Sequence, residues 1–300
     1  CGKTKDVFDL VEGFEEPSQV GGVYQIRAVG ELYWFTALVN GLLTDGTRPN
    51  RAANAVLTND ITVNSNVLNE SGNLIETSDI RFDWIPIGNS DRPYTGTFDG
   101  QGYTISGLYF NDSSKDNVGL FGNFYGKIQN TGVIDSYFEG NQAVGGLCGF
   151  IMRGEMKDCF SRSFVKGRIE VGGVCGDVCG SKVENAYQAG IVCGSSETET
   201  TVNGIFGSIS ATIFGNSQCS NCYYDTTLCP NMNACGSTSS SSATNVEGRS
   251  TTEFASGEVA YLLNNRVSDG TQRWYQNLST EGGDAYPNLN KSDKGSRTVY

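Results

Sequence analysis

The chain has 300 residues, with 39 glycines, ten cysteines and no histidine. Its 33 acidic residues outnumber its 21 basic residues, which gives a formal net charge of −12 and disfavours nucleic acid or an anionic membrane as a partner. The lack of histidine excludes the Ser-His and Cys-His hydrolase mechanisms and the commonest zinc hydrolase site.

The N-terminal part of the chain is predicted to begin the fold and to cap it. Residues 1–22 show little pattern and are interpreted as a linker or a strap. Residues 30–41 carry apolar side chains at helical spacing, which predicts a helix lying across the first coil. These side chains are Leu32, Phe35, Leu38 and Val39. We interpret Trp34 and Trp84 as core anchors beneath this cap, with sugar platforms as the alternative.

Four glycine-bracketed blocks in the middle of the chain decide the predicted fold. They are Gly119–Gly122 (GLFG), Gly146–Gly149 (GLCG), Gly173–Gly176 (GVCG) and Gly204–Gly207 (GIFG), at offsets of 27, 27 and 31 residues. Short apolar runs between turn residues indicate strands, and no unit has a helical period. Each unit is long enough for about three short strands and three corners. The repeat therefore predicts the stacked coils of a parallel β-solenoid.

Stacking is expected because one coil cannot bury its inward side chains alone. The second and third positions of the blocks then form two columns, and either column or both point inward. A further apolar position follows each block, at Ile128, Met156, Val183 and Phe214. The glycines are explained by corners, where positive φ or close backbone approach favours glycine.

The C-terminal part is predicted to close the solenoid. Residues 236–249 begin with a Ser- and Thr-rich run and are interpreted as a mobile linker. Ser250 followed by Glu253 predicts a capping box that starts a helix running toward Leu263. Residues 250–300 are therefore assigned to a C-terminal cap, in which Trp274 is the better candidate for an exposed aromatic side chain.

The blocks and their spacing resemble the GLUG repeat of bacterial surface and secreted proteins. Residues 31–41, 55–61, 84–88 and 95–105 are similar to the segment that usually precedes such repeats, and residues 251–264 resemble the segment that closes them. The resemblance implies an all-β, right-handed parallel β-helix, with cap and first coils at 23–110 and repeats at 111–235. It implies an architecture and no particular reaction.

The cysteines allow three interpretations: disulfides, buried thiols and a zinc site. Cys229 and Cys235 are predicted to close a loop disulfide, and further candidates are Cys148, Cys175, Cys179, Cys219 and Cys222. Cys148 and Cys175 lie one coil apart and are either a disulfide or buried thiols acting as small apolar residues. A zinc site at Cys219, Cys222, Cys229 and Cys235 is the alternative for the last group.

Four Asn-x-Ser sequences, at Asn69, Asn111, Asn277 and Asn290, are candidate N-glycosylation sites. Their alternative is coincidence in a chain rich in Asn and Ser. Together with the cysteines they favour an extracellular or cell-surface location.

No catalytic constellation emerges, and we assign no catalytic residue, cofactor or metal ligand. Asp135, Asp158 and Glu184 are the candidates for a glycosidase carboxylate pair, but they fall at different offsets within their units. The acid-rich loop 111–117 is a weak calcium candidate that lacks the spacing of a recognised calcium loop.

The sequence therefore predicts a non-catalytic extracellular β-helix with a structural, adhesive or assembly role. Its expected partner is a protein or glycan at the cell surface, and no apolar run approaches the ~18 residues of a membrane span. The alternatives are a polysaccharide lyase or hydrolase, suggested by architecture alone, and a glycan-binding module.

Overall fold

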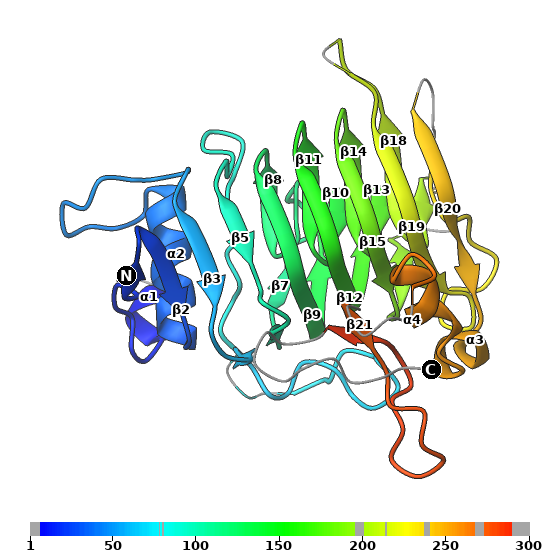
Figure 1. The fold of residues 1–300 in the computed structure, drawn as a ribbon. Helices are drawn as coiled ribbons and strands as arrows, with labels where there is room; N and C mark the ends of the chain where they lie inside the picture. The colour runs from blue at the N-terminus through cyan, green and yellow to red at the C-terminus, as the bar shows by residue number, and fades with distance from the viewer. Residues whose placement is uncertain are drawn as a thin grey trace.

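The computed structural model describes residues 7–77, 79, 81–195, 201–213, 215–236, 241–267 and 273–289. These residues form a parallel β-solenoid of about eight turns, as the repeat predicts. Successive turns lie side by side across Figure 1, from the N-terminal helices at one end to β20 near the other.

The longest sheet runs along the whole solenoid and takes one parallel strand from each turn. In spatial order these strands are β2 (Val23–Ile26), β3 (Asn54–Leu57), β5 (Thr97–Asp99), β9 (Lys127–Glu139), β12 (Glu155–Gly167), β15 (Lys182–Gln188), β19 (Gln218–Asp225) and β20 (Ser242–Arg249). The short strands β1 (Gln19–Val20), β4 (Ile61–Thr62), β6 (Thr104–Ser106), β7 (Tyr109–Asn111) and β16 (Val192–Gly194) also pair within this sheet.

Two shorter parallel sheets complete the middle turns. One contains β8 (Phe121–Phe124), β11 (Cys148–Met152), β14 (Cys175–Cys179) and β18 (Phe206–Ser210). The other contains β10 (Gln142–Gly145), β13 (Ile169–Gly172) and β17 (Val202–Asn203). The last three repeat blocks lie at the bends that join β10 to β11, β13 to β14 and β17 to β18.

The blocks stack in register, and both of their apolar columns are buried. Cys148 pairs with Phe121 on one side and with Cys175 on the other, and Leu147 and Cys148 are both 0% exposed. The column also has two members that the sequence repeat does not reveal. Ile87 bridges Phe121 and Cys235 bridges Phe206, although neither belongs to a block that begins with glycine.

Close backbone approach explains the block glycines. A Cβ at Gly146 would overlap the Ser161 hydroxyl, and one at Gly149 would overlap the backbone at Asn117 and Val118 in the preceding turn. Neither glycine has a positive φ. The turns can therefore bend tightly at the blocks only where no side chain intervenes.

A third apolar column stacks Ile128, Met156 and Val183 as expected. Its next member is Cys219, whereas Phe214, expected in this place, lies outside the described residues. Cys219 takes this place because the connection between β18 and β19 is longer than the connection between β14 and β15.

A ladder of left-handed residues follows this column and was not predicted. Five in-register residues, at 130, 158, 185, 221 and 245, have φ between 50° and 55°. They are Asn130, Asp158, Asn185, Asn221 and Asn245. Asn and Asp tolerate this conformation better than other residues with a Cβ, and each turn changes direction here.

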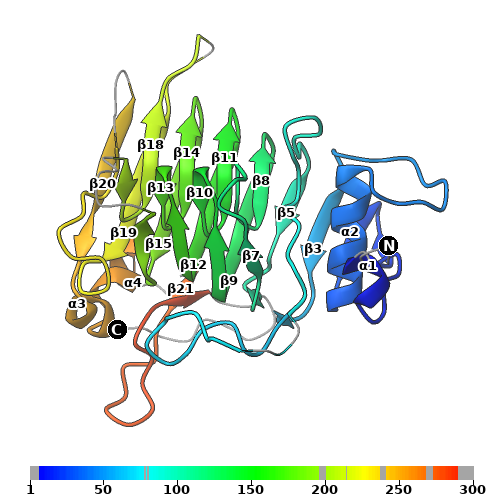
Figure 2. The same ribbon diagram turned by 180° about the vertical axis from the view of Figure 1, so that it is seen from behind.

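The N-terminal cap is as expected. Helix α2 (Val29–Asn40) lies beside β2 and β3 at the end of the solenoid (Figures 1 and 2), and Gly30 to Asn40 are buried. The short helix α1 (Val7–Leu10) falls within the segment expected to be a linker or strap. Trp34 and Trp84 are 5% and 1% exposed, which confirms them as core residues.

The C-terminal segment, residues 250–267 and 273–289 of the described chain, differs from expectation in where it packs and in the burial of Trp274. Its elements are α3 (Thr251–Ala255), α4 (Glu258–Leu263) and the antiparallel pair β21 (Trp274–Tyr275) and β22 (Asn288–Leu289). The capping box at Ser250 and Glu253 is present, but the helix it starts ends at Ala255, and α4 begins after Gly257, which has a positive φ. However, the segment packs against the outward side chains Phe160, Tyr187 and Tyr223 of the long sheet, forming a second core along its flank. Trp274, expected to be exposed, is 0% exposed within that core because it fills the space between the segment and the sheet.

The segment expected to be a linker also differs. Residues 242–249 form β20 and pair with β19 along its length. The local sequence does not predict a strand here. Residues 242–249 are extended because their backbone forms hydrogen bonds with the neighbouring strand β19.

Candidate functional site

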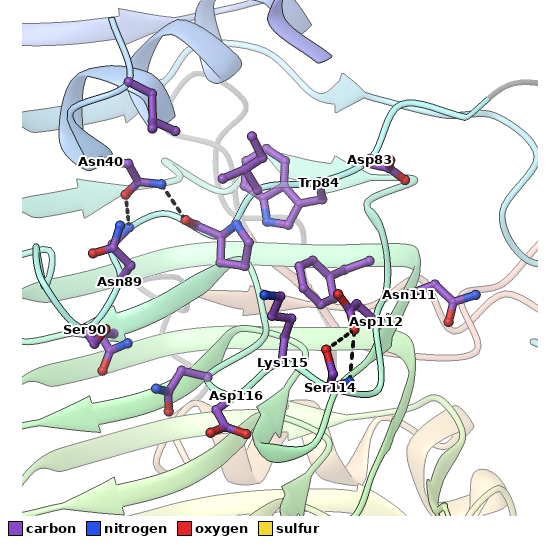
Figure 3. Close-up of a pocket in the computed structure, with 17 residues that line it drawn as sticks. Asn40, Asp83, Trp84, Asn89, Ser90, Asn111, Asp112, Ser114, Lys115 and Asp116 are labelled. Atoms are coloured by element: carbon purple, nitrogen blue, oxygen red, sulfur yellow. Dashed lines mark hydrogen bonds between the residues drawn. The ribbon is translucent and has the colours of Figure 1, made fainter. Parts of the chain in front are cut away.

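A groove with a volume of about 790 Å³ lies near the N-terminal end of the solenoid. Two segments form its walls, residues 83–90 and residues 110–117, and Asn40, Leu42 and Asn123 also line it. Figure 3 shows both walls and the polar side chains between them. The loop 111–117, which the sequence suggests only as a weak calcium site, lines this groove.

The first wall is held by α2 and by the neighbouring turn. The Asn40 amide donates to the Pro86 carbonyl (2.9 Å) and its oxygen accepts from the Gly88 amide (2.8 Å). The Trp84 indole donates to the Gly119 carbonyl (3.1 Å). These bonds fix the wall before any ligand binds, which lowers the ordering cost of binding.

The second wall is equally ordered. Asp112 accepts from the Ser114 hydroxyl (2.6 Å) and amide (3.0 Å). Asp116 accepts from the Asn141 side-chain amide (2.7 Å), and the Asn141 backbone amide donates to the Lys115 carbonyl (2.6 Å). The loop is thereby tied to the turn that follows it.

The groove is lined by amides, hydroxyls and carboxylates together with apolar groups. Its side chains include Asn89, Ser90, Asn111, Asn117 and Asn123, with Trp84, Pro86 and Phe110 among the apolar groups. Its charged residues are Asp83, Asp112, Asp116 and Lys115. In Figure 3 the Lys115 side chain reaches from its loop toward the opposite wall, and within the described part of the chain it forms no ion pair.

This chemistry suits a neutral polyhydroxy ligand. Amide and hydroxyl groups can each donate to and accept from sugar hydroxyls, and a few placed polar groups on an apolar surface are typical of small-ligand sites. Three carboxylates against one ammonium disfavour an acidic ligand. Hydrogen bonds from Ser114 lower the pKa of Asp112, so this carboxylate is an acceptor at neutral pH.

General acid catalysis needs a carboxyl that is protonated near neutral pH. The carboxyl pKa is raised by burial at Asp158 and, to about 6, at Asp177. Neither residue lines the groove.

The three carboxylates considered for glycoside hydrolysis lie in different surroundings. Asp135 lines a small cleft against residues 62–70. Asp158 is buried in the Asn ladder, and Glu184 forms an ion pair with Lys182 (3.0 Å). The structure therefore does not assemble them into a site.

None of the predicted disulfides is formed: all nine described cysteines are free thiols. Cys148, Cys175, Cys219 and Cys222 fill interior columns, and Cys179 is half-buried on β14. Cys229 donates to the Gly190 carbonyl (3.2 Å), whereas Cys235 lies over Phe206. Burial raises the pKa of Cys222 and Cys229 to about 12, so these thiols are protonated and act as small apolar groups.

The predicted zinc and calcium alternatives gain no support. Over the described ranges no three His, Cys, Asp or Glu side chains come close enough to hold a metal ion. Asn69, Asn111 and Asn277 are exposed, whereas Asn290 lies outside the described residues. Glycosylation at these positions remains a prediction, and a glycan on Asn111 would stand at the rim of the groove.

Within the described residues, no helix combines the length and apolar character needed to cross a bilayer. The fold and the groove define a capped parallel β-solenoid with a preorganised polar groove. Comparison of the chain with known protein families, curated proteins and solved structures gives no significant match. The resemblance to GLUG repeats therefore remains a prediction.

Proposed function

We propose that this chain is a non-catalytic, extracellular adhesive module that binds a neutral glycan in the groove between residues 83–90 and 110–117. The observation that carries the proposal is the groove itself, with both walls fixed by hydrogen bonds and lined by amide and hydroxyl groups. A rigid solenoid supports such a site well, because the groups that contact the ligand are positioned by packed turns.

A glycan array followed by calorimetry tests this proposal. We expect neutral glycans to bind, and Ser90→Trp, which places a bulky ring at the groove, to weaken binding at least tenfold. Ser90 and Thr47 are both exposed loop residues, so Thr47→Trp is the matched control and should bind as the unmodified chain does. Binding that is unaffected by Ser90→Trp would place the ligand elsewhere.

The competing function is a polysaccharide lyase or hydrolase. Incubation with neutral and acidic polysaccharides, scored for new reducing ends or unsaturated products, separates the two. Turnover by the purified chain that is abolished by Asp112→Asn or Asp116→Asn would replace the binding proposal with an enzymatic one.

A further inference from the structure

A column of outward side chains leads away from the groove along the solenoid. Asn123, which lines the groove, pairs in register with Phe150 on β11. Phe150 pairs with Asp177 on β14, and Asp177 pairs with Ser208 on β18. The four strands stand next to one another in Figure 1, so the column crosses four turns at a spacing of about 4.8 Å.

This column differs from the outward face that the C-terminal segment covers. Phe160, Tyr187 and Tyr223 are buried beneath that segment, whereas Phe150, Asp177 and Ser208 are only half-buried. Beside Phe150, Tyr125 is 36% exposed, and the two ring centroids are 6.4 Å apart in an edge-to-face arrangement. The column therefore presents accessible aromatic surface next to the groove.

Asp177 lies half-buried between Phe150 and Ser208 in the column. Its Oδ1 is buried and has no hydrogen-bond partner, although a buried acceptor is normally satisfied. Burial and the nearby charge of Glu170 raise the pKa of Asp177 to about 6. Because Oδ1 is enclosed by the chain, a ligand can reach only the exposed part of the Asp177 side chain.

We propose that the ligand is a linear neutral polysaccharide that continues from the groove over Asn123, Phe150, Asp177 and Ser208, parallel to the solenoid axis. Phe150 and Tyr125 supply apolar faces for sugar rings, and Asp177 and Ser208 bond the sugar hydroxyls. The spacing of the turns is close to the length of a sugar ring, so successive residues of a polymer meet successive turns. This inference rests on the proposed function of the groove.

Calorimetry with cello- and chito-oligosaccharides of two to eight sugars tests the inference. We expect affinity to rise about tenfold or more from the shortest to the longest ligand. Phe150→Ala and Asp177→Ala should remove this gain while leaving the affinity for short ligands unchanged. Asp177→Asn keeps the size of the side chain and an oxygen that accepts hydrogen bonds, so it is the conservative control and should retain the gain. Phe164→Ala removes a half-buried phenyl ring on the long sheet and is the control.

The outcomes separate the two proposals. Affinity that is independent of length, but sensitive to Ser90→Trp, overturns the extended site and leaves the groove intact. Failure of every oligosaccharide to bind overturns both proposals for this ligand class. Self-association in sedimentation analysis that is lost on Phe150→Ala would assign the column to contact between copies and overturn the inference.

Discussion

At the scale of single residues, Asp158 is the exception in a ladder of asparagines. The Asn185 amide donates to Asp158 Oδ1 (3.1 Å), as the Asn245 amide donates to Asn221 (2.9 Å). Asp158 also accepts from the Trp274 indole (3.2 Å) and is only 8% exposed. Each asparagine can donate to the turn before it and accept from the turn after it, whereas the Asp158 carboxylate can only accept.

Asp158→Asn should therefore stabilise the chain. The new amide can donate toward Asn130 while its oxygen still accepts from Asn185 and Trp274, and no buried charge remains. We expect a melting temperature higher by a few degrees at pH 7. Calorimetry measures the change, and Asn185→Asp, which adds a second carboxylate to the ladder, is the reciprocal control and should be destabilising.

The gain in stability from Asp158→Asn should depend on pH, in a direction set by the pKa of Asp158. Burial raises the pKa of Asp158 above its ordinary value, so the folded state binds the proton more tightly than the unfolded state. Stability contributed by this group is present in acid and falls as pH rises through the folded pKa. The advantage of Asp158→Asn should thus shrink as pH falls toward 4; an advantage that grows in acid would contradict this account.

Leu147 tests the interior column at the same scale. It is 0% exposed, and burial of a leucine side chain is worth about 1.5–3 kcal/mol, to which an unpaired carboxylate adds its desolvation cost. Leu147→Asp should therefore lower the free energy of unfolding by several kcal/mol in denaturant titration. Glu155→Ala, at an exposed position of the same turn, should change it little.

At the scale of elements, those with a periodic or local sequence signal were predictable, and those that form by packing against distant parts of the chain were not. The block spacing predicts the stacked turns, and the apolar spacing of residues 30–41 predicts α2. In contrast, β20 has no periodic apolar signal and forms because β19 offers it an edge. The position of the C-terminal segment depends on contact with the outward side chains Phe160, Tyr187 and Tyr223, and no local pattern in that segment reveals this contact.

The groove was equally hidden in the sequence. Its walls are separated along the chain, and Asn40 joins the wall of residues 83–90 to α2 through bonds to Pro86 and Gly88. The Asn ladder did leave a signal, because Asn or Asp precedes a small residue and an aromatic ring at 158, 185 and 221. Alignment of the turns on that triplet would have found it.

The capping box of α3 allows a prediction for a single element. Ser250 accepts from the Glu253 amide (3.3 Å), and Glu253 accepts from the Ser250 amide (2.7 Å). Ser250→Ala should cost about 1 kcal/mol of unfolding free energy, measured by denaturant titration. Ser250→Thr retains the hydroxyl and should cost much less; equal losses would show that the hydroxyl does not cap the helix.

At the scale of the whole molecule, the two ends of the solenoid are closed differently. Helix α2 covers the N-terminal end, whereas the C-terminal segment clamps the flank of β12, β15 and β19 through the second core. The last strand, β20, is mostly exposed, and its polar side chains, including Glu247 and Arg249, discourage pairing with other chains. Stability in such a stack is a sum of contributions from the turns and their neighbours.

Local stability of the turns should therefore depend on α2 at the N-terminal end and on the C-terminal segment along the flank. Trp274→Ala empties a fully buried site and should cost about 3–5 kcal/mol, with amide exchange accelerated in β12, β15 and β19 and unchanged in β2 and β3. Trp34→Ala, in the opposite cap, should produce the reverse pattern. Hydrogen exchange read by mass spectrometry distinguishes the two, because local opening exposes only the turns that each clamp holds. Uniform acceleration in both variants would mean that the solenoid opens as one unit and that its turns are not separable.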